Sequence, residues 1–92
     1  MYTFSVRITF HIPYAESLKD KRMVSRSLLD KARRKFNASI AEVDTQDNHR
    51  VLTIGIAVVA GEASHGQDYL DKIVRFVEGN TDAVLVESVY DE

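Results

Sequence analysis

The chain has 92 residues, of which 45% are hydrophobic and 28% are charged, and it contains no cysteine. This length predicts one compact domain, residues 1–92, and leaves no room for a deep ligand cavity. The composition excludes disulfides, thiolate nucleophiles and cysteine-ligated metal sites, and the apolar runs are too short to span a membrane. Because residues 1–7 show no signal-peptide pattern, we expect a cytoplasmic protein.

The net charge of −2 conceals a strong asymmetry along the chain. Residues 17–36 hold eight basic and two acidic residues, a net charge of +6, and the rest of the chain carries −8. Such separation of charge affects which partners the protein binds and how fast it meets them, and it does not determine the fold. The small total charge therefore excludes no anionic partner.

The first half of the chain predicts a strand and a helix. Apolar and polar residues alternate over residues 3–12, which is typical of a half-buried strand, and Pro13 ends the pattern. Ser17 is then the predicted N-cap of a helix, with Asp20 at the third helical position. The helix continues to Phe36 with one apolar face toward the core.

The second half predicts two strands, a helix and a last strand. Residues 38–43 and 51–60 are the strands, and the second of these is apolar at nearly every position, as in a central strand covered on both faces. Residues 64–67 have the composition of a capping box that starts a helix. Apolar residues follow it at helical spacing: Leu70, Ile73, Val74 and Val77. Residues 84–90 form the last strand.

The order βαββαβ predicts a ferredoxin-like α+β sandwich, in which two helices cover one face of a four-stranded antiparallel sheet. The first and third strands are central, and their bulkier faces are expected to meet the helices. By parity, the opposite, open face carries Val51, Thr53, Gly55, Ala57, Val59, Leu85 and Val89. Because this face is more apolar than a water-facing sheet usually is, we expect a second copy to cover it in a homodimer.

Gly55 and Arg7, both on the open face, are expected to make specific contacts. Gly55 weakens a central strand unless something approaches it closely, and we expect the approach of a partner, with a simple bulge as the alternative. Arg7 is expected to pair with Glu87 of the neighbouring strand.

The first helix is the candidate functional element. Four of its cations lie within about 60° of one another on the helical wheel: Lys19, Arg22, Arg26 and Arg33. They extend over roughly 21 Å, at a rise of about 1.5 Å per residue, which suits several phosphates of a nucleic-acid backbone. The alternative is a solvated face in which Asp30 pairs with Arg26 and Arg34.

The first turn of this helix is also a candidate site for a small anion. Ser17, Lys19, Lys21 and Arg22 lie at the positive end of the helix dipole, where free amides and cations suit a phosphate or a carboxylate. Lys21 falls at the edge of the apolar face, so its stem is expected to pack there while its head reaches out. The alternative is an ion pair with Glu16 or with acids of the second strand.

The sheet and the remaining polar residues do not predict a further site. RNA-binding domains of this topology stack bases on aromatic residues of strands one and three. Here Phe4 and Phe10 face the core, and residues 51–60 contain no aromatic side chain, so RNA contact is expected through the charge of the helix. The histidines lie on separate elements without partners at metal-ligand spacing: His11, His49 and His65. We expect no catalytic residue, no metal and no cofactor.

Three blocks of the sequence resemble the YlxP-like family of small bacterial proteins of unknown function. They are SLKDKR at 17–22, FNASIAEV at 36–43 and GIAVV at 55–59, and the likeness extends over essentially the whole chain. The resemblance implies a ferredoxin-like fold. Family members are often encoded among translation factors and a ribosome-binding factor, which implies work associated with RNA or the ribosome.

The sequence thus predicts a non-catalytic module that contacts RNA or a ribosomal particle through its basic first helix, with nothing that favours DNA and no membrane partner. A protein-interaction or assembly domain that dimerises through its open sheet face is the first alternative. The second is a small-anion-binding module at the start of the same helix.

Overall fold

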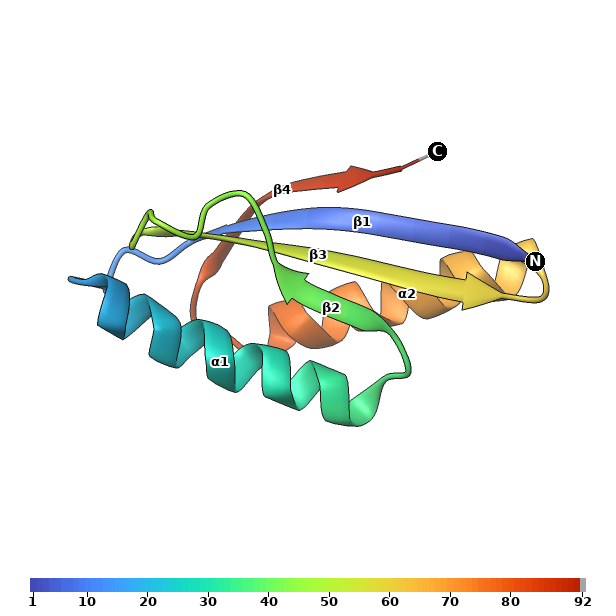
Figure 1. The fold of residues 1–92 in the computed structure, drawn as a ribbon, viewed down its shortest axis with the longest axis horizontal. Helices are drawn as coiled ribbons and strands as arrows, with labels where there is room; N and C mark the ends of the chain where they lie inside the picture. The colour runs from blue at the N-terminus through green and yellow to red at the C-terminus, as the bar shows by residue number, and fades with distance from the viewer. Residues whose placement is uncertain (92) are drawn as a thin grey trace.

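The computed structural model describes residues 1–91 and has the predicted βαββαβ order. The elements are β1 (Tyr2–His11), α1 (Leu18–Lys35), β2 (Ser39–Glu42), β3 (Val51–Ala60), α2 (Ala63–Gly79) and β4 (Val84–Tyr90). The strands form one antiparallel sheet in the order β2-β3-β1-β4, and Figure 1 shows both helices on the same side of it. The ferredoxin-like arrangement predicted from the sequence is confirmed.

The core lies between the sheet and the helices. β1 and β3 pair along their whole length, with Val6 opposite Ile56 and Ile8 opposite Ile54. Since side chains of a strand alternate between its faces, these residues all point toward the helices, where they are buried. The four apolar residues predicted on α2 are buried against them. The predicted inner faces of the two central strands are therefore correct.

A β-bulge changes which residues of β4 face the helices. The register of β4 against β1 shifts between Thr9 and Phe10, so Leu85 lies opposite Phe10 and packs against the core. The prediction that Leu85 belongs to the open face is wrong, because counting every second residue from Val89 ignores the extra residue of the bulge. Val89 lies opposite Arg7 and does face the open side.

The start of α2 is set by packing rather than by a cap. The helix begins at Ala63, after Glu62, with no side-chain cap hydrogen bond, so the capping box predicted at residues 64–67 is wrong. Gly66 is buried in the first turns, where a Cβ would lie 2.2 Å from Cε2 of Phe4 on β1. The missing side chain lets α2 approach the sheet closely.

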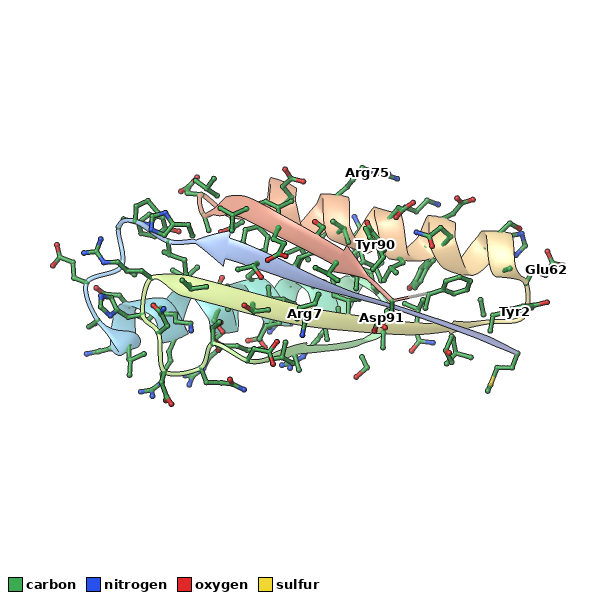
Figure 2. The ribbon with its side chains drawn as sticks, turned by 90° about the horizontal axis from the view of Figure 1, so that it is seen from above. Tyr2, Arg7, Glu62, Arg75, Tyr90 and Asp91 are labelled. Carbon is green, nitrogen blue, oxygen red and sulfur yellow. The ribbon has the colours of Figure 1, made fainter. Side chains whose placement is uncertain are left out.

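A hydroxyl connects β4 to α2 near the end of the chain. The Tyr90 hydroxyl donates to the Asp71 carboxylate over 3.2 Å, and Figure 2 shows Tyr90 between β4 and α2, with Arg75 on the outer side of α2. Partial burial raises the pKa of Tyr90, and the Asp71 charge raises this pKa further, whereas Arg75 opposes the shift.

Candidate functional site

Lys21 is a structural residue and not part of an anion site. Its side chain is 1% exposed, and its Nζ lies 2.7 Å from the Glu42 carboxylate of β2. The same ammonium donates to the backbone carbonyls of Thr45 and Asn48, the latter over 2.7 Å. The prediction that Lys21 binds an anion is therefore wrong, and the alternative, an ion pair with an acid of the second strand, is confirmed.

Arg33 is likewise engaged by the fold. Its Nε and Nη2 both donate to the carbonyl oxygen of Ile40, over 2.9 and 2.7 Å. Because Val43 hydrogen-bonds to Thr53 in the same ladder, the backbone groups of Ile40 point away from β3, at the free edge of the sheet. Arg33 thus covers an open strand edge, and this contact does not favour its predicted role in RNA binding.

Of the five cations of α1 predicted to bind an anion or RNA, three remain free for a partner: Lys19, Arg22 and Arg26, which we call the basic stripe. All three are exposed, and among residues 1–91 no carboxylate lies within 4.0 Å of any of their charged groups. They line a shallow groove on the outer face of α1, together with Met23, Ser27 and Asp30. The stripe is about 10.5 Å long at 1.5 Å per residue.

The predicted neutralisation of this face by Asp30 does not occur in the described part of the chain. No cation lies within 4.0 Å of the Asp30 carboxylate, so the expected pairs with Arg26 and Arg34 are not formed. Met23, which is 66% exposed, lies among the cations of the groove and was not among the predicted site residues. Its position on the wheel, opposite the apolar face, was the available signal.

The start of α1 is already occupied by a carboxylate. The Asp20 N–H donates to Ser17 Oγ over 3.1 Å, as predicted for an N-cap, and the Glu16 N–H donates to the Asp20 carboxylate over 3.0 Å. A second anion here would meet the negative charge of Asp20, and the buried Lys21 is not available to bind it. These contacts do not favour a small-anion site at this turn.

The connection between β2 and β3 folds onto the open face of the sheet (Figure 1). Val43 lies over Gly55, where a Cβ would be 3.3 Å from Val43 Cγ1. Thr53 is buried, and its hydroxyl lies 3.0 Å from that of Thr45. The close approach expected at Gly55 is thus made by the chain itself, and Gly55 no longer supports a partner at that point.

Polar contacts cover the middle of the open face. Arg7 pairs with Asp44 of the connection over 3.0 Å and not with Glu87, so the predicted pair is wrong. Asp44 has a φ of 62°, in the left-handed region, which turns the chain toward Arg7. Ser5 donates to the Asp91 carboxylate, and Figure 2 shows Arg7 and Asp91 over the central strands.

Fewer residues of the predicted dimer face are therefore accessible than expected. Of the seven predicted, three are exposed in residues 1–91: Ala57, Val59 and Val89. Val51 and Gly55 are half-buried, Thr53 is buried, and Leu85 packs toward the helices. A homodimer through this face stays a prediction.

The side chains that could ligate a metal do not gather into a site in the described residues. Within residues 1–91, no group of three or more histidine, aspartate or glutamate side chains is placed to hold a metal ion. Neither α1 nor α2 is long and apolar enough to cross a membrane.

The fold and the sequence both have recognisable relatives. A de novo designed protein with a ferredoxin fold, LFR1 1, whose structure was solved by NMR in solution, superposes with a TM-score of 0.64. The match covers 100% of this chain and 87% of the design, at 17% identity, and so defines the class as a ferredoxin-like domain.

The particular family follows from the sequence. A family model described as "Protein of unknown function (DUF503)" matches residues 3–90, and the chain belongs to this family. The uncharacterized protein YlxP of Bacillus subtilis (strain 168) is 34% identical over 64 residues, which cover 70% of each protein. The resemblance to the YlxP-like family noted in the sequence is confirmed.

Proposed function

We propose that this protein is a non-catalytic module that binds RNA of a ribosomal particle electrostatically, through the basic stripe of α1. The supporting observation is the row of exposed cations that have no carboxylate within 4.0 Å in residues 1–91, on a helix where Lys21 and Arg33 are bonded within the fold. Free cations in a fixed row bind a polyanion by releasing its condensed counterions.

The family resemblance supports a ribosomal particle as the source of the RNA, because family members are encoded among translation factors. Such a partner also places the proposed action in the cytoplasm. The three cations of the stripe form an exposed row along one helix, so the contact is expected with phosphates.

Co-sedimentation with ribosomal particles from a bacterial extract, at two salt concentrations, tests the proposal. We expect the wild type to pellet with the particles at low salt and to be released at high salt or by RNase. The Arg22→Glu/Arg26→Glu variant should stay in the supernatant.

A matched control separates the stripe from the total charge. Lys31→Glu/Lys72→Glu changes the net charge equally, but Lys31 lies on the other flank of α1 and Lys72 lies on α2. This control should pellet like the wild type. The proposal is contradicted if the stripe variant pellets as well as the control does.

Self-association through the open face is the second candidate, favoured by the exposure of Val59, which is 68% exposed, and of Val89. A complex that survives RNase, or a purified protein that sediments as a dimer, would favour it over RNA binding. Val59→Lys should then abolish the dimer, because the charge would be buried in the interface.

A further inference from the structure

The basic stripe is short and is bounded by acids. Asp30 lines the groove beyond Arg26, and Asp20 with its bonded Glu16 lies at the other end of the helix. A backbone that ran on along α1 would therefore meet a carboxylate next to each end of the stripe, and past Asp30 it would reach Arg33, which is bonded to Ile40, and Arg34. The stripe accommodates about 10.5 Å of an anionic partner.

Over this length, single-stranded and double-helical nucleic acids carry different numbers of phosphates. One strand of a nucleic acid presents about three phosphates over 10.5 Å, whereas a double helix presents about six, because each strand contributes one charge per roughly 3.4 Å of axis. Single-strand binders compensate for the lower charge density with long grooves that follow the backbone. The stripe does not provide such length.

Base stacking, the other contribution to single-strand binding, is also missing from the groove of the basic stripe and from the open face of the two central strands. The groove side chains are Lys19, Arg22, Met23, Arg26, Ser27 and Asp30, none of which is aromatic. The open-face positions of β1 and β3 carry no aromatic residue either, and the loop bearing Val43 and Thr45 covers their middle. Unpaired bases in the groove thus find no ring on which to stack, because the exposed rings of Tyr2, Tyr14 and Tyr90 do not line it.

The shape of the site suits a duplex instead. The groove between the stripe side chains is shallow and lies on the convex outer face of α1, and A-form RNA offers a wide, shallow minor groove lined by phosphates and 2′-hydroxyls. Cations on a rigid helix lose little freedom when they meet phosphates that are already held at fixed spacing, whereas a flexible strand must first be ordered. Met23 and Ser27, between the cations, are placed to meet the sugars.

From these observations we infer that the RNA bound by the basic stripe is double-helical, and that the protein contacts the backbone of an RNA stem rather than an unpaired segment. This inference rests on the proposed function and specifies the form of RNA that the same site binds.

Fluorescence anisotropy with two labelled probes tests the inference: an RNA duplex of about 16 base pairs and an unstructured oligouridine of equal strand length. In about 50 mM salt, a low concentration that favours phosphate contacts, we expect the duplex to bind at least tenfold more tightly. Arg22→Glu/Arg26→Glu should abolish duplex binding, while Lys31→Glu/Lys72→Glu should retain it within about twofold. Circular dichroism confirms that each variant is folded.

The outcomes distinguish the two proposals. Equal or tighter binding of oligouridine, lost in the stripe variant, overturns the duplex inference and leaves RNA binding through the stripe in place. Failure of both probes to bind overturns the inference and the proposed function together. Duplex binding that the stripe variant retains assigns the contact to another surface and overturns the inference as well.

Discussion

Gly66 shows how a single missing side chain positions a whole helix. A Cβ at this position would lie 2.2 Å from Cε2 and 2.3 Å from Cδ2 of Phe4, and 3.1 Å from the Cβ of Ala60. Gly66→Ala is therefore expected to force α2 or the Phe4 ring to move, at a cost of about 1–3 kcal/mol. The midpoint of urea unfolding measures this cost.

Gly79, at the other end of α2, provides the control. A Cβ at this position would have nothing within 4 Å, so Gly79→Ala should be neutral or stabilising by up to about 1 kcal/mol. Equal stability of the two alanine variants would contradict the packing account of Gly66.

Lys21 links α1 to β2 and to the loop that follows β2. Lys21→Met keeps the apolar stem but leaves the Glu42 carboxylate, which is 18% exposed, without its cation and two carbonyls without their donor. We expect a loss of about 3–5 kcal/mol, measured by chemical denaturation. Adding Glu42→Gln should recover part of this loss, because the partly buried charge is removed. Strictly additive losses would contradict the ion pair.

For single residues, the sequence predicts which contacts a side chain could make more readily than which contact it does make. The spacing of Lys21 on the wheel predicts a buried stem, but the choice between an anion and an internal acid depends on where Glu42 lies, and only the packing of α1 against β2 brings the two together. Leu85 was misplaced for a similar reason: one extra residue in a bulge reverses the alternation, and no composition signal marked it.

At the scale of the element, the cations of α1 have two separate tasks. Lys21 and Arg33 hold β2 and the loop after it, although they lie on different faces of the helix, and the free cations of the basic stripe face solvent. Alanine substitution is therefore expected to lower the stability of the fold at a cation bonded within it, and to weaken RNA binding at a free cation.

Arg33→Ala and Arg26→Ala test this division. Arg33→Ala removes two hydrogen bonds to Ile40 and should cost about 1–2 kcal/mol of stability while RNA binding stays close to that of the wild type. Arg26→Ala should leave stability within about 0.5 kcal/mol but weaken binding. Urea unfolding and anisotropy on the same samples measure both, and a drop in binding at Arg33 equal to that at Arg26 would contradict the division.

The elements themselves follow closely from periodicity. Alternation predicts β1, a nearly continuous apolar run predicts β3, and the 3.6-residue period predicts both helices. The errors lie where tertiary contacts override local signals. The helix α2 begins at Ala63, before the predicted cap, where Gly66 packs on Phe4. The strand β2 is shorter than the predicted residues 38–43, because its first and last predicted residues belong to the connections on either side.

For the whole molecule, the separation of charge along the chain becomes a separation in space. The molecule measures 43 × 24 × 18 Å, and α1, about 27 Å long, forms much of one side with the cations on its outer face. The basic helix was visible in the sequence, but which of its cations are free was not, since that depends on the position of the β2 edge. The apolar open face was overestimated because the sequence does not show the loop that folds over it.

The salt dependence of duplex binding tests the central claim, that the three cations of the basic stripe carry the contact with RNA. For three neutralised phosphates, the logarithm of the binding constant should fall with the logarithm of salt concentration with a slope of about −2.7. Replacing Lys19, Arg22 and Arg26 one after another by alanine should reduce this slope by about 0.9 at each step. A slope that is unchanged after all three replacements would contradict the account.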